Sequence, residues 1–215
     1  IDAARKAGVP VSNNGGANSV AVSEHALMLM LAVSRKLVRQ HANVADGRWR
    51  GNETPKLYEL RNKTLGIIGL GTIGKKTARL ALAFGMEVVY FDVARLTEGE
   101  EDALGVRFRL LREVLREADL ISLHVPLNSS TRHMISAAEF TEMKSSAMVI
   151  NTSRGPVVDQ KALYGALLER RVAGAGLDVF DPEPPPPDDP ILGLDNVIVA
   201  PHSLGWTDQM FARMA

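Results

Sequence analysis

Short apolar segments alternate with helical stretches through most of the chain. Six of these segments, centred near residues 65, 88, 121, 148, 176 and 198, are apolar at almost every position. A strand with such a pattern is buried on both faces of its sheet. The stretches at 110–117, 137–143 and 160–170 have helical spacing instead. This alternation predicts an α/β fold, in which helices cover both faces of a doubly wound parallel sheet of six strands.

The first 50 residues precede this alternation and contain a long helical stretch. Residues 1–17 predict the end of a helix, a short strand at 9–12 and a glycine-containing loop. A helix is expected over 19–46, with Asn18 or Ser19 as its N-cap and Gly47 after its last turn. Its middle, 26–33, is apolar on every side but far shorter than the ~20 residues that span a bilayer. We therefore predict a helix buried between other elements.

A glycine motif follows the first predicted strand. Gly69, Gly71 and Gly74 have the G-x-G-x-x-G spacing and open a helix, and Asp92 follows the next strand. In this context the glycines allow a tight turn, close approach of the backbone to a pyrophosphate and close helix packing, while the acid binds a ribose. The motif predicts a dinucleotide site. The alternative interpretation is a glycine-rich turn that binds no nucleotide.

Composition argues against several other classes of function. The 25 basic and 25 acidic side chains cancel, so no overall charge favours nucleic acid or an anionic membrane as a partner. The chain has no cysteine, which excludes disulfides and thiolate chemistry, and its five histidines lack the spacing of metal ligands. The absence of a recognisable secretory signal favours the cytoplasm. We therefore expect a protein that acts on a small molecule without a metal ion.

Polar residues follow most of the later predicted strands, at the edge of the sheet where such folds bind ligands. These residues are His124, Pro126, Asn151, Thr152, Ser153, Arg154, Asp178 and His202, with Glu183 a few positions beyond the fifth strand. An arginine, two acids and a histidine at one crevice could bind a carboxylate and move a proton. Each side chain alone would also fit an ordinary structural role, such as a surface ion pair.

Taken together, these motifs resemble those of the D-isomer-specific 2-hydroxyacid dehydrogenases. The matching segments are GLGTIG at 69–74, HVPL at 124–127, NTSRG at 151–155, LDVF at 177–180 with Glu183-Pro184, and Pro201-His202. The resemblance implies a Rossmann-type fold and an oxidoreductase that transfers hydride between NAD(H) and a small D-2-hydroxy acid or 2-oxo acid. It does not choose among glyoxylate, hydroxypyruvate, lactate and phosphoglycerate. The alternative is a corepressor-like protein that senses NAD(H) without turnover, because the wider family includes such proteins.

The resemblance also implies roles for individual residues. Arg154, Glu183 and His202 take the catalytic positions, and Asn18 borders the substrate together with Arg154. The residues implied at the cofactor are Gly69, Gly71, Thr72, Ile73, Gly74, Asp92, His124, Pro126, Thr131, Thr152, Ser153, Asp178, Gly205 and Val22. A guanidinium can bind a carboxylate through two hydrogen bonds, and an imidazole held by a carboxylate can donate a proton, so the side chains suit these roles.

The resemblance further implies how the chain is divided. Residues 1–17 would be a remnant of a substrate-binding half, 18–205 the NAD-binding domain, and 206–215 the start of a truncated C-terminal helix. We expect a homodimer formed through the 19–46 helix, because residues 27–31 are apolar in every direction. Leu204 and Trp206 replace smaller residues usual there, and would narrow the site or contact another subunit. The chain alone should bind NADH with little turnover.

Overall fold

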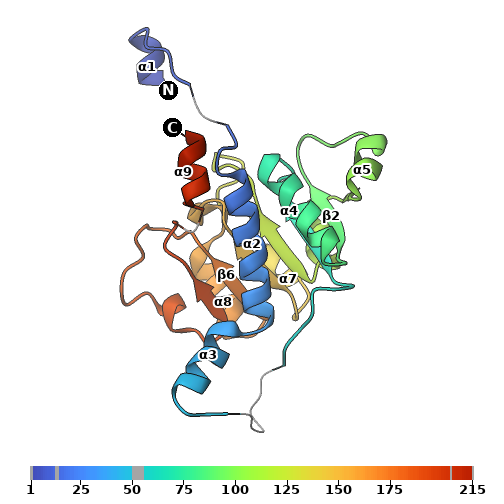
Figure 1. Ribbon diagram of the computed structural model, residues 1–215, viewed down its shortest axis with the longest axis vertical. Helices are drawn as coiled ribbons and strands as arrows, with labels where there is room; N and C mark the ends of the chain where they lie inside the picture. Colours follow the sequence, from blue (N-terminus) through green and yellow to red (C-terminus); the bar gives the residue numbers. More distant parts are fainter. Residues whose placement is uncertain (1, 13–14, 50–55, 204, 215) are drawn as a thin grey trace.

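A seven-stranded parallel sheet forms the centre of the fold in the computed structural model, which describes residues 2–12, 15–49, 56–203 and 205–214 (Figure 1). The strands are β1 (Thr64–Ile68), β2 (Glu87–Phe91), β3 (Arg107–Phe108), β4 (Leu120–Leu123), β5 (Met148–Asn151), β6 (Gly174–Leu177) and β7 (Val197–Val199). Their order is β3-β2-β1-β4-β5-β6-β7, with all neighbours parallel. The order reverses between β1 and β4, where a doubly wound sheet forms its ligand crevice. The predicted fold class is confirmed.

Helices cover both faces of this sheet. On one face α2 (Ser19–Ser34) packs against α4 (Thr72–Ala83), and on the other lie α6 (Leu111–Glu117), α7 (Ala137–Glu142) and α8 (Gln160–Leu168). The remaining helices are α1 (Asp2–Lys6), α3 (Leu37–Ala45), α5 (Glu98–Leu104) and α9 (Asp208–Met214). Figure 1 shows α1 away from the sheet, and none of its residues is buried. Among the described helices, none is long and apolar enough to cross a membrane.

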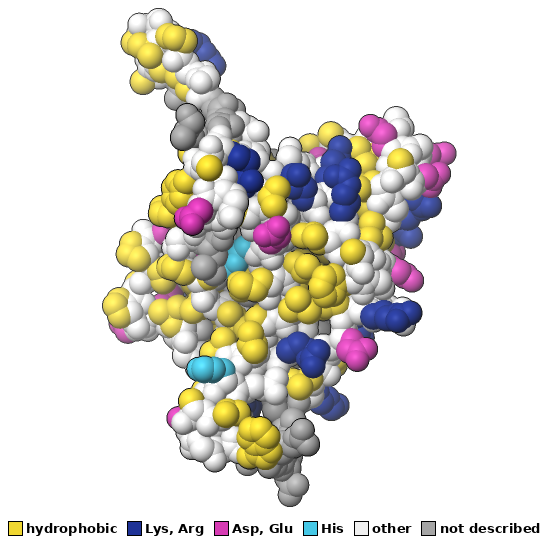
Figure 2. All heavy atoms as spheres, in the orientation of Figure 1, with side chains coloured by type: hydrophobic (Ala, Val, Ile, Leu, Met, Phe, Trp, Pro, Cys, Tyr) yellow, Lys and Arg dark blue, Asp and Glu magenta, His cyan; other side chains and the backbone are white. Residues whose placement is uncertain are grey.

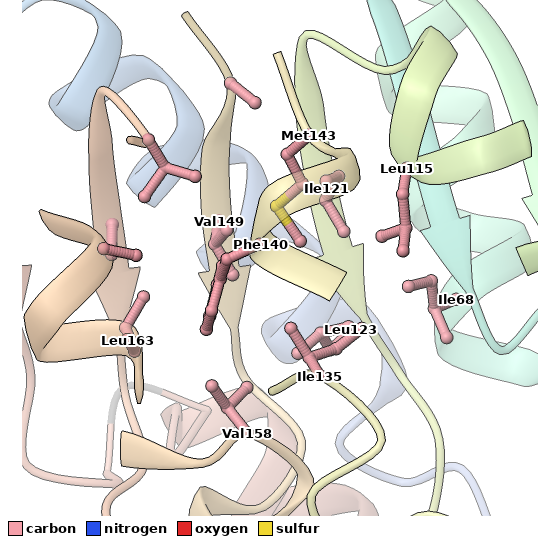
Figure 3. Close-up of a cluster of buried hydrophobic side chains, with 14 of the residues drawn as sticks. Ile68, Leu115, Ile121, Leu123, Ile135, Phe140, Met143, Val149, Val158 and Leu163 are labelled. Atoms are coloured by element: carbon pink, nitrogen blue, oxygen red, sulfur yellow. The ribbon is translucent and has the colours of Figure 1, made fainter. Parts of the chain in front are cut away.

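Two apolar cores lie against the two faces, because successive strand residues point to opposite sides of a sheet. In β1, Ile67 belongs to the core beneath α2 and α4, whereas Ile68 belongs to the core beneath α6, α7 and α8. Figure 3 shows the second core, in which Phe140 of α7 lies close to Val149 of β5. Burying one such side chain contributes ~1.5–3 kcal/mol, so both layers hold the sheet in place.

α2 is buried as predicted, because this chain covers most of it. Leu29 and Met30 are fully buried and Leu27 is 8% exposed, against 45% for Met28. Its neighbours are α4 and strands β5, β6 and β7. Close approach to β6 depends on a glycine, since a Cβ on Gly176 would lie 3.0 Å from the Cβ of Leu29. This chain therefore covers residues 27–31 only in part, because Met28 stays exposed and Leu31 is half-buried.

The helix expected over 19–46 is two helices. Asn18 holds the N-cap position of α2, although its side chain makes no capping hydrogen bond. α2 ends at Ser34, and Lys36 takes a left-handed conformation (φ 48°) before α3 begins. The carbonyl of Ser34 accepts a hydrogen bond from the N–H of Tyr58 at 3.0 Å, in place of the bond that would continue the helix. Tyr58 lies beyond α3, so the local pattern does not reveal this break.

Three further differences separate the prediction from the fold. The sequence prediction omits α5, which begins with a capping box between Thr97 and Glu100 and ends at left-handed Gly105. It also omits β3, a two-residue strand at the edge of the sheet. The strand predicted at 9–12 does not form. Val9 and Val11 are 56% and 58% exposed, and no strand of the described sheet pairs with that segment.

Candidate functional site

The glycine turn lies between β1 and α4, where the strand order reverses. Gly69 has φ 97°, and a Cβ there would lie 2.8 Å from the carbonyl carbon of His124 at the end of β4. A Cβ on Gly74 would overlap the carbonyl oxygen of Gly69, so glycine is needed for α4 to pack on the turn. Gly71, the N-cap of α4, faces open space. The turn therefore leaves room for an anion at a helix N-terminus, which favours negative charge.

Asp92 is joined to the glycine turn by hydrogen bonds. Its Oδ2 accepts from the N–H of Leu70 at 2.6 Å, and its Oδ1 accepts from the N–H of Ala94 at 2.9 Å. The carboxylate is half-buried. It therefore lies beside the turn that would hold a pyrophosphate, which is where the acid of a dinucleotide site binds the adenosine ribose.

Arg95, the cation nearest to Asp92 in sequence, is held by other groups. Its Nε lies 3.2 Å from Oε1 of Glu101, and its guanidinium carbon lies 4.8 Å from the centre of the Phe108 ring. Glu101 is 4% exposed and also accepts from the hydroxyl of Tyr90 at 3.1 Å. Burial raises the pKa of Glu101, but the hydrogen bonds from Tyr90 and Arg95 outweigh it and hold this pKa below its ordinary value. Glu101 therefore stays ionised near pH 7 and retains Arg95.

The loop after β4 carries His124, Pro126 and Thr131. Nε2 of His124 lies 2.9 Å from the hydroxyl of Ser122, and burial lowers the pKa of His124 to about 4. The imidazole is therefore neutral near pH 7. Oγ1 of Thr131 donates to the carbonyl of Pro126 at 2.6 Å and accepts from the N–H of Asn128 at 2.9 Å. Thr131 thus holds the shape of the loop that borders the crevice.

A compact loop after β5 presents Arg154 at the crevice. Oδ1 of Asn151 accepts from the N–H and the hydroxyl of Ser153 at 3.0 and 2.8 Å. The Nδ2 of Asn151 donates to the carbonyl of Arg154 at 3.0 Å. Thr152 and Ser153 are buried in this loop, whereas Arg154 is exposed. The hydrogen bonds of Asn151 therefore set the direction in which the loop projects the arginine.

His202 and Glu183 form a side-chain pair. Nδ1 of His202 lies 2.8 Å from Oε2 of Glu183, whose Oε1 accepts from the N–H of Phe180 at 2.9 Å. Burial raises the pKa of Glu183, but the bonds from His202 and Phe180 and the charges of His202 and Arg154 lower it overall. The ionised carboxylate orients the imidazole through Nδ1 and leaves Nε2 for another group. His202 has a left-handed backbone (φ 54°), which is uncommon for residues other than glycine and occurs at constrained functional sites.

Asp178 is buried immediately after β6, close to this pair. Its side chain is 7% exposed, and its Oδ1 has no hydrogen-bond partner among the described residues. Burial raises its pKa, while the charges of His25 and His202 oppose that shift. Oγ1 of Thr152, after the neighbouring strand β5, is also buried without a partner in the described parts of the chain. Buried polar atoms are normally paired, so these two atoms fit a site that a polar ligand such as NAD would complete.

The start of α2 and the loop around Gly205 meet the crevice from the other side. A Cβ on Gly16 would lie 3.6 Å from Cγ2 of Thr72 in the first turn of α4, which places Asn18 near that turn. A Cβ on Gly205 would lie 2.9 Å from Cγ2 of Val22. Segments that are far apart in sequence therefore converge at one edge of the sheet.

Of the two bulky residues near the end of the chain, Leu204 and Trp206, only Trp206 is described. Leu204 lies outside the described residues. Trp206 is 65% exposed and makes an edge-on contact with Phe211 of α9, with 6.3 Å between the ring centres.

No group of three or more His, Asp or Glu side chains within the described ranges is arranged to hold a metal ion.

One residue beside the site, His25 of α2, is not among the site residues predicted from the sequence. The structure places its Nε2 3.7 Å from Oδ1 of Asp178. The only sequence signal is a histidine within an apolar helical segment, which does not identify its neighbour. The contact depends on how α2 crosses β6.

Comparisons with known proteins agree with this geometry. The pattern of the family described as D-isomer specific 2-hydroxyacid dehydrogenase, NAD binding domain, matches residues 27–203. A glyoxylate reductase of Korarchaeum cryptofilum is 44% identical over 218 residues, and the match covers all of this chain and 65% of that protein. A structure of D-lactate dehydrogenase from Aquifex aeolicus complexed with NAD and lactic acid superposes with a TM-score of 0.89 at 34% identity, covering 99% of this chain and 68% of that one.

A third relative widens the range of known ligands. The structure of an acyclic imino acid reductase in complex with NADPH and D-Arg has a TM-score of 0.89 at 32% identity, and the match covers 99% of this chain and 66% of that one. The chain spans about two thirds of the length of these three relatives. It belongs to the D-isomer specific 2-hydroxyacid dehydrogenase family and contains the NAD-binding domain of that family.

Proposed function

We propose that this protein is an oxidoreductase that transfers hydride between NAD(H) and a small D-2-hydroxy acid or 2-oxo acid. The observation that carries the proposal is the His202–Glu183 pair, in which Nδ1 and Oε2 are 2.8 Å apart. Arg154 is close enough for its positive charge to lower the pKa of Glu183. These residues follow β5, β6 and β7, at the edge where α/β sheets bind ligands. A relative named glyoxylate reductase and another solved with NAD and lactic acid support this reaction class.

Each catalytic side chain has a defined task in this proposal. Arg154 binds the substrate carboxylate through two parallel hydrogen bonds and orients the adjoining carbonyl. NAD(H), when bound, supplies or accepts the hydride. His202 donates a proton to the carbonyl oxygen during reduction and removes it during oxidation. Glu183 holds the imidazole at Nδ1 and is itself held by the N–H of Phe180.

The cofactor residues follow the crevice from one end to the other. The glycine turn and the start of α4 would hold the pyrophosphate, and Asp92 would bind the adenosine ribose. The middle of the crevice is bordered by His124, Pro126 and Thr131, and the nicotinamide end by Thr152, Ser153, Asp178, Val22 and Gly205. Asn18 borders the substrate. The unpaired buried atoms of Thr152 and Asp178 support the nicotinamide end, where Asp178 would accept a hydrogen bond from the carboxamide.

We also propose that NAD(H) is preferred to NADP(H). The carboxylate of Asp92 would repel a 2′-phosphate, and Arg95 is occupied by Glu101 and Phe108. A like-charge contact of this kind can cost several kcal/mol. A similar protein was solved in complex with NADPH, so the preference needs its own test.

We also propose that the protein forms a homodimer through the exposed apolar residues of α2 and α3. These residues cover a smaller area than the whole 19–46 segment expected from the sequence. Val20 and Met28 of α2 are exposed, and so are Leu37, Val38 and Val44 of α3, at 55–60% for the last three. Figure 2 shows apolar side chains over this part of the surface. Sedimentation velocity at micromolar concentration should show a dimer, and Val38→Glu should shift it to monomer. A wild-type monomer would contradict this.

We further propose that residues 1–17 belong with a substrate-binding half and residues 18–205 with the NAD-binding domain. The exposure of this segment supports the division, because α1 has no buried residue and, among the described residues up to 17, Ala17 alone is buried. Limited proteolysis between residues 7 and 17 should release the segment without lowering the melting temperature of the remainder by more than about 2 °C. A larger fall would show that the segment stabilises the domain.

Two measurements test the proposed reaction. NADH binding to this chain is followed by fluorescence, and NADH oxidation is measured with glyoxylate, hydroxypyruvate and pyruvate. In a protein of the full family length, we expect turnover with at least one acid and loss of ~100-fold or more in kcat for His202→Gln. This chain alone should bind NADH with turnover below about 1 per second, because rate depends on positioning the substrate away from water. Tight binding without turnover at full length would favour the NAD(H)-sensing alternative.

A further inference from the structure

Every fourth residue of α2 lies beside every second residue of the segment that contains β6. The pairs are Val33 with Gly174, Leu29 with Gly176 and His25 with Asp178. A Cβ on Gly174 would lie 3.0 Å from Cγ1 of Val33, and a Cβ on Gly176 would lie 3.0 Å from the Cβ of Leu29. Four helical residues rise ~6 Å and two strand residues ~6.6 Å, so the register continues along both elements. The next step brings His25 to Asp178.

His25 and Asp178 face each other in a buried environment. Nε2 of His25 lies 3.7 Å from Oδ1 of Asp178, and the two side chains are 3% and 7% exposed. Neither atom has a hydrogen-bond partner among the described residues. The separation is longer than a hydrogen bond, so a small movement of either side chain would close it. An unpaired buried donor or acceptor costs ~1–3 kcal/mol, which favours that movement.

The two groups complement each other chemically. Burial lowers the pKa of His25 and raises that of Asp178, and the charge of each partner opposes these shifts. A neutral imidazole with its proton on Nε2 can donate to a carboxylate without placing a second buried charge beside it. The other titratable groups that act on Asp178 are His202 and Glu183, which lie on the catalytic side.

We infer that His25 is a positioning residue, whose Nε2–H holds the carboxylate of Asp178 in the direction in which it receives the nicotinamide carboxamide. This inference rests on the proposed function, which assigns Asp178 to the cofactor. His25 itself touches neither the substrate nor the reacting atoms. Asp178 already has a hydrogen bond with the backbone of His202, whereas its Oδ1 has no partner among the described residues. Without the donor on His25, Oδ1 would be held less firmly or the carboxyl group would take up a proton, and either change would weaken its bond to the carboxamide N–H.

The inference is tested by comparing NADH with ADP-ribose, which lacks the nicotinamide ring. Binding of both is measured by calorimetry for wild-type, His25→Leu, His25→Gln and Asp178→Asn chains. We expect His25→Leu to weaken NADH binding about tenfold while ADP-ribose binding stays within about threefold. His25→Gln retains an N–H donor and should recover most of the loss. Leu168→Ala, at the exposed end of α8 on the other face of the sheet, is the control and should leave both affinities unchanged.

The variants distinguish failure of this inference from failure of the proposed function. If Asp178→Asn weakens NADH selectively and His25→Leu does not, the role of His25 is wrong and that of Asp178 stands. If Asp178→Asn spares NADH, the assignment of Asp178 to the cofactor is wrong, and the inference fails with it. Equal losses for NADH and ADP-ribose in His25→Leu would indicate a general structural role and overturn the inference.

A second measurement does not depend on the leucine variant folding. Nitrogen-15 NMR of the histidine side chains in the wild-type chain reports which ring nitrogen of His25 carries the proton, with His25→Gln used to assign the signal. We expect a proton on Nε2 at pH 7, and a shift of this signal on addition of NADH that ADP-ribose does not produce. A proton on Nδ1 alone, or equal shifts with both ligands, would overturn the inference.

Discussion

Replacing Asp92 by asparagine tests why the site should prefer NADH to NADPH. Asp92→Asn removes the negative charge beside the glycine turn, but its amide oxygen can still accept from the N–H of Leu70. It cannot also accept from the N–H of Ala94, so the turn loosens and both cofactors lose affinity. The ratio of the two dissociation constants cancels this shared loss. We therefore expect the ratio to report the charge of Asp92 together with its hydrogen bond to the 2′-hydroxyl, which NADPH lacks.

The size of the effect follows from Coulomb's law. Two unit charges 4 Å apart interact by about 1 kcal/mol in bulk water and about 4 kcal/mol at an effective dielectric constant of 20. Asp92 is half-buried, so we take about 2 kcal/mol per unit charge. A phosphate monoester carries about −1.5 to −2 charges, and physiological salt screens roughly half of the repulsion. The remaining ~1.5–2 kcal/mol corresponds to a roughly 10–30-fold preference for NADH.

Fluorescence titration with NADH and NADPH measures both dissociation constants. Asp92→Asn should bring their ratio to within about threefold of 1, and 0.5 M salt should reduce the wild-type preference. Arg95→Ala is the matched control. Its ratio should stay within about twofold of wild type, because Glu101 already holds that guanidinium. Equal affinity of the wild type for both cofactors, or a ratio that Asp92→Asn leaves unchanged, would refute the reasoning.

Three further predictions concern catalysis and stability. In a protein of full family length, His202→Gln should leave the dissociation constant of NADH within a few-fold of wild type while kcat falls ~100-fold, as stopped-flow kinetics would show. Gly155→Ala should destabilise the fold by at least about 3 kcal/mol in urea denaturation, because the new Cβ would overlap the carbonyl of Phe180. As a control, Gly165→Ala in α8 places its Cβ in open space and should stabilise the fold by ~0.5 kcal/mol. Hydrogen bonds from Arg112 and Arg116 lower the pKa of Glu142 to about 2 from an ordinary 4.5. These bonds therefore stabilise the fold fully above pH 4.5, and the stabilisation is lost as the pH falls toward 2. Calorimetry should therefore show Glu142→Gln melting below wild type at pH 7, and the difference closing over that acidic range.

Much of the sheet could be predicted from the sequence, because a strand buried on both faces must be apolar at nearly every position. Six of the strands follow from such runs, and the glycine turn follows from its spacing between a strand and a helix. α5 was predictable too, since Thr97, Glu100 and Gly105 are the standard signals of a capping box and a helix end. A two-residue edge strand such as β3 carries no such pattern.

The side chains proposed to be catalytic could be named from their motifs, but the sequence did not show what holds them. Glu183 lies in a proline-rich segment, and the N–H that fixes its carboxylate comes from Phe180. The break after α2 depends on a hydrogen bond from the N–H of Tyr58, which lies beyond α3. Arg95 is held by Glu101, and the amino-acid pattern does not show that this acid is buried.

Local hydrophobic periods and turn residues were enough to place most of the elements and to identify the chemical groups at the strand ends. Which of these groups come into contact depends on how the elements pack. His25 reaches Asp178 because two glycines in β6 let α2 approach closely enough for the register of helix and strand to coincide. Such a contact depends on packing between segments that are distant in the chain, and local periodicity carries no information about that distance.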